Sequence, residues 1–434
     1  METITVTLEQ MIAGGKCIST TDDGKKVLVS GGLNGEKVEA KVISEKKDFS
    51  EAVAVKIISE NPNRVTPKCP KFSSCGGCNL QFASSDYQVE LKKAILHSAL
   101  ERNGINFPKD DIIIVRDKDW DYRNRFQLHK GCLFERGTNF FSEKESLVPF
   151  ENCCIAKNEI KQYFSDKEHL DEAKKYDKYF VFSGDEVFCS PSQDDNDTNK
   201  KSVIGKKNTK AKSGGKRKIY EGTNFNNRSV ATAKIDGKEI SFDVRGFFQS
   251  NLGMLEKTAQ IIKEDFYGEN LIDIYAGCGT FSVILSENFK HSTLVEHNRD
   301  AIVFAEMNLK NTKLSSSHES FGLSGEKFVS LHSPSVVRLA DGHFSSVADS
   351  HFSTRTFDAA VVDPPRSGME KSIVNWLCHS NIPRIRSLSC DPVTHARDIS
   401  HLVEAGYSIK KLYLLDYYPQ TSHIESLAFL EKDF

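Results

Sequence analysis

The chain has 434 residues, enough for two or three domains with a sizeable buried core. Its formal net charge is −2, so the composition gives no argument for a nucleic-acid partner, and any basic surface must be local. A signal-peptide pattern and an apolar run of about 18 residues are both lacking, so we expect a cytoplasmic protein without a membrane segment.

Residues 1–62 predict a small β-domain. Three β-rich runs, at 27–29, 37–43 and 52–58, are separated by turns that contain glycine. A five-stranded barrel of the OB type fits this pattern, and such barrels often bind oligonucleotides. Short β-barrels without a ligand are also common, so the residues alone leave RNA binding and simple packing both open.

Residues 63–245 are predicted to form a central domain that begins with a cysteine cluster. Cys69, Cys75 and Cys78 follow one another at x5 and x2 spacing. The eleven cysteines of the chain are better explained as ligands, a nucleophile and core thiols than as a disulfide framework. The spacing is compatible with zinc or with an iron–sulfur cluster. A helix is predicted over 86–103, and short strands with a charged helix over 120–184.

Two polar inserts interrupt the chain. The first, at about 191–218, carries nine basic and no acidic residues between Lys200 and Lys218, and it is predicted to be disordered. It is either a solvated insertion or an arm that attracts phosphates. The second, at about 313–354, is rich in Ser and His. Its histidines lack the close pairing expected of metal ligands.

The C-terminal part, 246–434, predicts a Rossmann-like α/β domain. Buried-type strands at 271–275, 292–296 and 357–363 alternate with helical stretches, which is typical of a mostly parallel sheet. The first strand leads into a loop with Gly277 and Gly279, and Glu296 ends the second strand, where its carboxylate can accept ribose hydroxyls. The loop lacks the third glycine of a dinucleotide fingerprint and the Gly-Lys-Ser/Thr of a P-loop. A compact nucleoside such as S-adenosylmethionine therefore fits better.

Cys390 follows an expected strand at 385–389 and precedes Asp391-Pro392. Strand tips at this edge of an α/β sheet are where ligands bind, so the position favours a nucleophilic thiol, although a buried core thiol is the commoner fate of such a cysteine. A thiolate here needs a cation or a helix N-terminus nearby, and Arg397 is a candidate cation.

Two further motifs carry carboxylates. Asp363-Pro364-Pro365-Arg366 ends another strand, and the arginine stands where amine-methylating enzymes often place a stacking aromatic residue. This argues against chemistry on an exocyclic amine and leaves room for a carbon target. Glu425 follows an aromatic stretch, so its pKa is expected to be raised and it is a candidate base; a surface glutamate in a polar strand is the alternative.

Together these residues resemble the uracil-C5 RNA methyltransferase family, in particular its 23S ribosomal-RNA branch with a TRAM domain and an iron–sulfur cluster. The resemblance spans nearly the whole chain apart from the inserts. It is carried by the following motifs: Phe247-Phe248-Gln249-Ser250-Asn251, the Asp273–Thr280 loop, Val295-Glu296, Asp363-Pro364-Pro365-Arg366, Ser389-Cys390-Asp391-Pro392 and Thr421-Ser422-His423-Ile424-Glu425.

The resemblance implies a role for each matching residue. Cys390 would be the nucleophile and Glu425 the general base. S-adenosylmethionine would be held by Gln249, Tyr275, Thr280, Glu296 and Asp363. A [4Fe-4S] cluster would be bound by Cys69, Cys75, Cys78 and Cys153, with Cys154 as the alternative fourth ligand. A strand expected over 327–334 shows no acidic or amide residue for the adenine.

The expected activity is therefore S-adenosylmethionine-dependent methylation of C5 of a uridine, in 23S ribosomal RNA, by a monomeric protein that binds RNA. One competing interpretation is a methyltransferase of the same cofactor class that acts on an exocyclic amine of RNA or DNA. Another is a non-catalytic RNA-binding iron–sulfur protein. The sequence does not identify the uridine that is modified.

Overall fold

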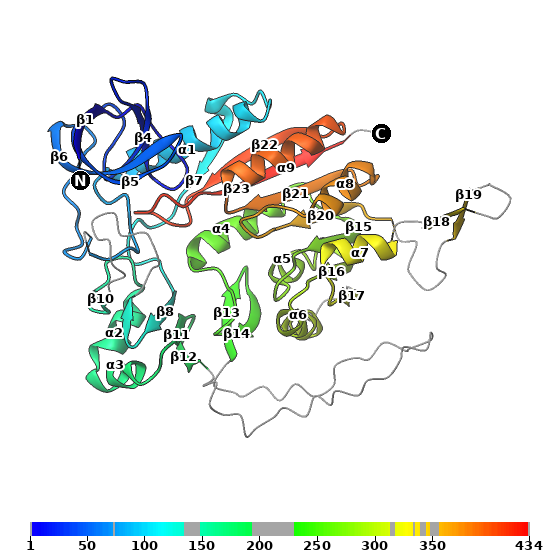
Figure 1. Cartoon of the computed structure of the whole chain (residues 1–434). Helices are drawn as coiled ribbons and strands as arrows, with labels where there is room; N and C mark the ends of the chain where they lie inside the picture. The colour runs from blue at the N-terminus through cyan, green and yellow to red at the C-terminus, as the bar shows by residue number, and fades with distance from the viewer. Residues whose placement is uncertain are drawn as a thin grey trace.

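The computed structural model describes residues 2–72, 74–133, 148–192, 230–312, 317–332, 335–338, 344–347 and 356–432. Figure 1 shows a β-rich N-terminal part, a small α/β part below it, and a large sheet flanked by helices that is built mainly from the C-terminal half. Nearly all of the predicted basic insert at 191–218, and part of the Ser/His-rich insert at 313–354, lie outside the described residues.

The N-terminal part is one six-stranded sheet where five strands were predicted. Its strands are paired in the order β1-β5-β6-β4-β3-β2. They span β1 Thr3–Thr7, β2 Gln10–Met11, β3 Cys17–Thr20, β4 Lys26–Ser30, β5 Lys37–Glu45 and β6 Phe49–Ser59. Along β5 the buried residues alternate with more exposed ones, as expected of a strand with one face in a core. The closed OB-type barrel stays a prediction.

The central part contains a five-stranded sheet in the order β10-β9-β8-β11-β12, packed against two short helices. The predicted single charged helix is in fact two, because Asp166 ends the first and caps the second with a bond from the Glu168 N–H. These elements are β8 Arg125–His129, β9 Cys132–Leu133, β10 Val148–Pro149, α2 Asn158–Ser165, α3 Lys167–Lys174, β11 Tyr179–Ser183 and β12 Val187–Pro191.

The large sheet has eight strands in the order β17-β16-β15-β20-β21-β23-β22-β7. Only β23 runs antiparallel to its neighbours. The strands are β7 Ile112–Val115, β15 Gly268–Ile274, β16 Phe289–Val295, β17 Ser317–Phe321, β20 Ala359–Val362, β21 Arg384–Ser389, β22 Ser408–Leu415 and β23 Glu425–Glu431. The mostly parallel α/β sheet expected for the C-terminal part is thus present. Its edge strand β7 comes from the predicted central segment.

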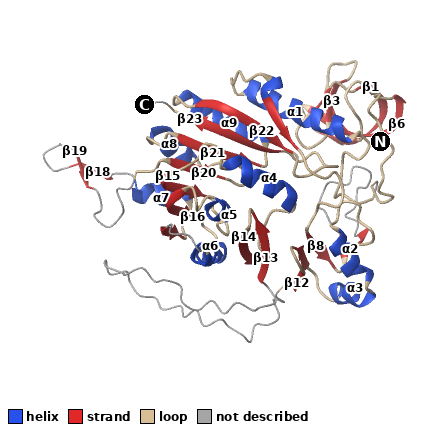
Figure 2. Cartoon of the chain, turned by 180° about the vertical axis from the view of Figure 1, so that it is seen from behind, coloured by secondary structure: helices blue, strands red, loops and turns tan. Residues whose placement is uncertain are grey.

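Helices cover both faces of this sheet, and each face has its own apolar core (Figure 2). Alternate residues of one strand serve the two cores: Ile272 and Ile274 face one, Leu271 the other. One face carries α1 Ser85–Arg102, α7 Gly325–His332, α8 Lys371–His379 and α9 Pro392–Glu404. The other carries α4 Leu252–Ile262, α5 Thr280–Ile284, α6 Arg299–Asn311 and the hairpin of β13 Val230–Ile235 with β14 Lys238–Asp243.

One sequence expectation about this domain is wrong. Residues 327–334 were expected to form the strand after Glu296, but 325–332 form the helix α7, and the strand beside β16 is β17. The reason is tertiary: Phe328 is fully buried and packs edge-on against Trp376 of α8 and Phe321 of β17. Among the helices that the structure describes, none is both long and apolar enough to cross a bilayer.

Candidate active site

A glycine loop and the tip of the next strand form a linked polar site at one edge of the large sheet. The Gly277 N–H donates to Glu296 Oε2 at 3.0 Å, and the Asn298 N–H donates to Oε1 at 2.6 Å. Gly277 has a φ of 55° and faces open space, so the loop leaves room for a ligand there. Tyr275 and Thr280 stand at the two ends of this loop, and their predicted contact with a cofactor stays a prediction.

Two aspartates lie on neighbouring strand ends, Asp273 in β15 and Asp363 directly after β20. Asp273 is buried, and Oδ2 accepts two bonds from Ser282 while Oδ1 has no partner within the described part of the chain. Burial, with the nearby Asp363 charge, raises the pKa of Asp273 to about 7. Burial raises the pKa of Asp363 to about 6. Such a site favours a cationic ligand.

Gln249, predicted to touch the cofactor, has a buried Oε1 atom that finds no protein donor in the described residues. A buried acceptor without a partner is rare and costly, so this atom is suited to a bond with a ligand. The carbonyl of Gln249 is held by the Asn124 side-chain amide at 3.4 Å. The polar loop, the open space beside Gly277 and this acceptor together fit a nucleoside with a sulfonium charge.

The sheet register brings Cys390 and Glu425 together. Ser389, the last residue of β21, pairs with Ser426 of the antiparallel strand β23. The next opposing positions are Cys390 and Glu425, so two residues separated by 34 intervening residues lie side by side. Burial and the Glu425 charge raise the pKa of the Cys390 thiol to about 12. Burial and the Asp363 charge raise the pKa of Glu425 well above its usual range.

The cation that acts on this pair is Arg366, not the predicted Arg397. Arg366 lowers the pKa of both Cys390 and Glu425. The Arg397 guanidinium is instead engaged by Asp398, with contacts of 2.9 and 2.6 Å from Nε and Nη2 to Oδ1. The cause is local, since its chain neighbour Asp398 offers a carboxylate on the same helix.

Helix α9 begins directly after Cys390. Asp391 caps it by accepting bonds from the Val393 and Thr394 N–H groups, and Pro392 is its first residue. The N-terminal end of a 13-residue helix therefore faces the thiol, which favours its anionic form. The sequence suggested that either a cation or a helix N-terminus would assist the Cys390 thiolate, and both are present.

Sequence reasoning missed His395 on this helix. Its ring nitrogens lie 2.7 Å from Ser426 Oγ and 3.1 Å from Ser387 Oγ, so one buried imidazole bridges the strands that carry Cys390 and Glu425. Burial lowers the pKa of His395 to about 4, so the ring is neutral at physiological pH. No sequence signal distinguished it from an ordinary residue of an amphipathic helix.

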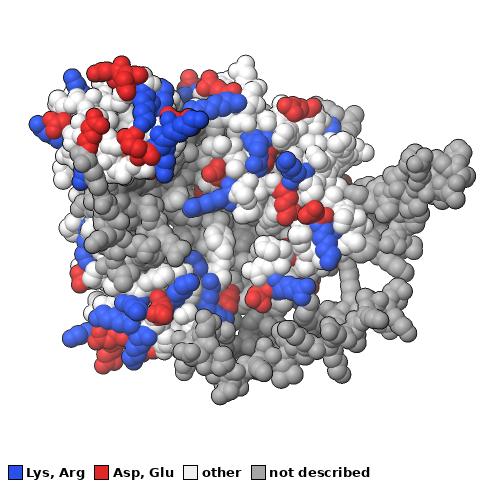
Figure 3. Space-filling view, in the orientation of Figure 1, with Lys and Arg blue, Asp and Glu red and all other residues white. Residues whose placement is uncertain are grey.

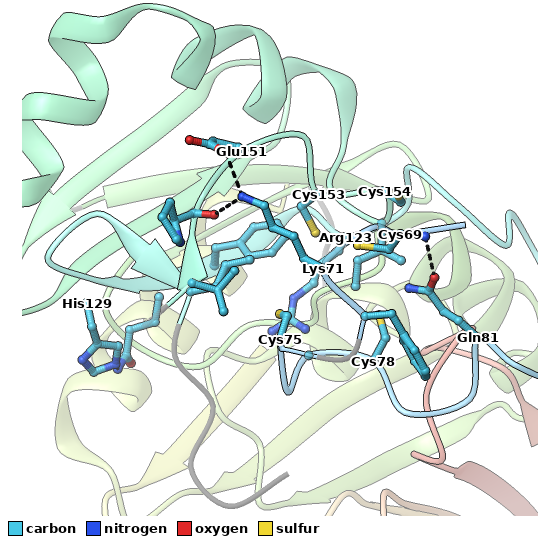
Figure 4. Close-up of a pocket in the computed structure, with 18 of the residues that line it drawn as sticks. Cys69, Lys71, Cys75, Cys78, Gln81, Arg123, His129, Glu151, Cys153 and Cys154 are labelled. Carbon is cyan, nitrogen blue, oxygen red and sulfur yellow. Dashed lines mark hydrogen bonds and ion pairs between the residues drawn. The ribbon is translucent and has the colours of Figure 1, made fainter. Parts of the chain in front are cut away.

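The second predicted site is a pocket of about 270 Å³ lined by all four proposed metal ligands and by Cys154 (Figure 4). Cys78 is close enough to Cys75 and Cys153 for their charges to interact, and Cys154 faces Cys69. Burial raises the pKa of Cys153 to about 11. As arranged, however, no group of three or more His, Cys, Asp or Glu side chains within the described ranges could hold a metal ion.

Arg123 connects the cysteine pocket with the site around Glu425. It lines the pocket, and its charge lowers the pKa of Cys78 and Cys153. The same charge acts on Tyr418 and His423, whose rings lie 5.7 Å apart on the loop that leads to Glu425. The two predicted sites are therefore distinct in composition but neighbours in space.

The sequence profile of the family described as tRNA (Uracil-5-)-methyltransferase matches residues 202–433, more than half of the chain. The chain belongs to this uracil-C5 RNA methyltransferase family. The predicted family is thereby confirmed. The 23S ribosomal-RNA branch stays a prediction.

Individual relatives match the chain over nearly its full length. An uncharacterised RNA methyltransferase of Treponema denticola is 34% identical, with 99% of each chain covered. The 23S rRNA (uracil(1939)-C(5))-methyltransferase of Acinetobacter baylyi is 24% identical and covers 95% of this chain and 90% of its own. Among solved structures, the Pyrococcus abyssi tRNA (uracil-54, C5)-methyltransferase in complex with S-adenosyl-L-homocysteine has a TM-score of 0.63 at 20% identity, covering 98% and 99% of the two chains.

The role of Arg366 can be tested without RNA. Replacing Arg366→Gln removes the positive charge that opposes burial, so the pKa of Cys390 rises further and its thiolate fraction falls. Alkylation of Cys390 by iodoacetamide, followed by peptide mass spectrometry at pH values below the thiol pKa, should slow by about three- to tenfold. Arg397→Gln is the matched control and should alkylate like the unmodified protein. Equal slowing in both variants would show that Arg366 is not the decisive cation.

Proposed function

We propose that the protein methylates C5 of a uridine in RNA, with S-adenosylmethionine as methyl donor and Cys390 as the covalent nucleophile. The observation that carries this proposal is the juxtaposition of Cys390 and Glu425 at the ends of β21 and β23, beside a loop suited to a cationic nucleoside. A thiol and a base at adjacent positions are what addition to a pyrimidine ring and later elimination require.

The donor would be bound by Gln249, Tyr275, Thr280, Glu296 and Asp363. Glu296 would accept the ribose hydroxyls, as carboxylates at this strand tip do. The unpartnered Gln249 Oε1 and the carboxylate of Asp363 would face the polar and cationic end of the ligand. When bound, S-adenosylmethionine supplies a methyl group on a positively charged sulfur. The remaining chemistry belongs to the chain's own side chains.

Cys390 makes the ring carbon reactive. Its thiolate adds to C6 of the uracil, and the electron pair displaced from the C5–C6 double bond makes C5 electron-rich, so that C5 accepts the methyl group. The target base must first be flipped out of the RNA, because the thiol cannot reach C6 while the base is stacked on its neighbours. Arg366 and the N-terminal end of α9 would favour the thiolate form of Cys390.

Glu425 completes the cycle as the general base. After methylation, the carboxylate removes the proton from C5, the C5–C6 double bond re-forms, and the bond between C6 and the Cys390 sulfur breaks to release the thiolate. Because burial raises the pKa of Glu425, the carboxyl holds its proton to a higher pH than a surface glutamate. The proton-removal step is therefore expected to slow as pH falls through this raised pKa.

The RNA class is proposed to be 23S ribosomal RNA. The full-length match to the Acinetobacter baylyi enzyme supports it. We propose that the N-terminal sheet is a TRAM-type RNA-binding barrel. Basic and acidic side chains are mixed on the face drawn in Figure 3, so a local arrangement and not overall charge would have to attract the RNA. We propose that the protein acts as a cytoplasmic monomer.

The covalent mechanism predicts different defects in two variants. Cys390→Ala should bind S-adenosylmethionine normally but lose methylation, whereas Glu425→Gln should accumulate a protein–RNA adduct because the C5 proton stays in place. Denaturing gels and intact-protein mass spectra with unmodified RNA measure both. RNA substituted with 5-fluorouridine, which has no removable proton at C5, should trap the unmodified enzyme as an adduct but not Cys390→Ala. In the unmodified enzyme, adduct breakdown should slow at lower pH. Full turnover by Cys390→Ala would rule out this mechanism and favour amine methylation.

The substrate class has its own test. Cells with and without the gene should differ at a 5-methyluridine in 23S ribosomal RNA, and the purified protein should methylate the corresponding transcript. Mapping of 5-methyluridine in both ribosomal and transfer RNA measures this. Loss of the modification from transfer RNA alone would move the protein to that substrate, while binding of RNA without any methylation would favour a non-catalytic protein.

We also propose that Cys69, Cys75, Cys78 and Cys153 bind a [4Fe-4S] cluster. The lining of one pocket by five thiols, with Arg123 beside them, supports this proposal. As arranged, no three of the described side chains could hold a metal ion, so the thiols would have to move closer together to bind the cluster. A cluster bound there would supply a rigid, charged centre; we assign it no redox step.

Anaerobically purified protein should then be brown and contain about four iron atoms per chain. Cys153→Ser should lose the iron, whereas Cys154→Ser should retain it. Colourless protein that contains zinc would contradict the cluster. Iron loss in Cys154→Ser but not in Cys153→Ser would show that Cys154 is the fourth ligand.

A further inference from the structure

The loop between β22 and β23, residues 416–424, ends at Glu425 and is held mainly by side chains from far away in the sequence. Lys92 Nζ lies 2.6 Å from Asp416 Oδ1 and 3.0 Å from the Tyr418 carbonyl. The Tyr122 hydroxyl donates to the Pro419 carbonyl at 2.9 Å. These partners come from the segment before residue 123, so the loop is not positioned by the sheet alone.

Gln88 holds the turn at Gln420 by two reciprocal bonds. The Gln420 N–H donates to Gln88 Oε1 at 2.8 Å, and Gln88 Nε2 donates to Gln420 Oε1 at 3.0 Å. Gln420 has a φ of 72°, which a residue with a side chain adopts only when its surroundings hold it there. Gln88 is therefore part of what keeps this conformation.

Asn79 holds Ser422 in the same way. The Ser422 N–H donates to Asn79 Oδ1 at 2.7 Å, and Asn79 Nδ2 donates to Ser422 Oγ at 2.8 Å. The backbone N–H groups of Asn79 and Leu80 both donate to the Gln420 carbonyl. Ser422 is three residues from Glu425, and Asn79 directly follows Cys78 of the cysteine pocket.

We propose that Asn79 and Gln88 are positioning residues that hold the Glu425 carboxylate at the C5 proton of the target uracil. The inference rests on the proposed function of Glu425. A displacement of Ser422 or Gln420 is passed to Glu425 over three to five residues of chain, and general-base catalysis depends on sub-ångström placement. Lys92 is less informative, because its removal leaves Asp416 as a buried unpaired charge and destabilises the fold as a whole.

The test separates formation of the covalent adduct from its breakdown. In full-length Asn79→Ala and Gln88→Ala, adduct formation by Cys390 should change little, while adduct breakdown should slow by about ten- to a hundredfold, so the adduct accumulates on unmodified RNA. A general loss of stability would lower both steps. Asn79→Asp keeps both Ser422 contacts, since a carboxylate accepts from the N–H and from the hydroxyl, and should restore most of the breakdown rate.

Asn103→Ala is the matched control, since Asn103 donates to the Ala99 carbonyl at the far end of α1. It should behave like the unmodified protein. Hydrogen exchange of the Gln420 and Ser422 amides gives a readout without RNA, and both should exchange faster in the alanine variants. Folded Asn79→Ala and Gln88→Ala proteins with unchanged breakdown rates would overturn the inference. An absent adduct in Glu425→Gln would instead overturn the proposed function, whatever the exchange rates show.

Discussion

The antiparallel insertion of β23 between β21 and β22 is the constraint on which the site depends. In a purely parallel sheet, the start of one strand and the end of its neighbour lie at opposite edges. Reversing β23 places its first residue, Glu425, beside the last residue of β21, and Cys390 follows there. His395 reinforces this register by bridging Ser387 and Ser426 across the two strands. The proposed chemistry, with a nucleophile at C6 and a base at the adjacent C5 of one ring, therefore depends on the direction of one strand.

The same arrangement is electrostatically unfavourable. Burial together with the Asp363 charge raises the pKa of both Cys390 and Glu425, and the Glu425 charge raises that of Cys390 further. Arg366 is the cation that opposes this, and it is exposed, so solvent weakens its effect. The raised pKa values favour the protonated thiol and the protonated Glu425 carboxyl. On the proposed mechanism, a positively charged donor beside Asp363 would offset part of this effect.

Much of the fold could be predicted from sequence, because buried strands and the helix at 86–103 have strong local patterns. The predictions that failed are those that depend on contacts between elements far apart in the sequence. The short apolar run around Phe328 fits strand or helix, and contact with Trp376 decided it. Arg397 looked like the cation because it follows Cys390 closely, yet Asp398 engages it. Arg366 and His395 act across elements, so no spacing in the sequence revealed them. Cys390 and Glu425 were each candidates from their sequence surroundings, and the resemblance joined them as a proposed catalytic pair; their closeness comes only from strand register.

The residues proposed to be catalytic lie in the C-terminal part of the chain, and residues from the N-terminal part help to hold them in place. The family profile covers 202–433, but β7 pairs with β22 and α1 packs on α9 from outside that range. Without residues 79–92, the Asp416 carboxylate would be left without Lys92, the Gln420 turn without Gln88 and Ser422 without Asn79. A buried charge and a left-handed turn both need external partners to persist. Residues 79–92, which follow the cysteine pocket, are accordingly a structural part of the large sheet domain. Because Asn79 follows Cys78 directly and bonds to Ser422, a structural change in the pocket has a short path to Glu425 through covalent and hydrogen bonds.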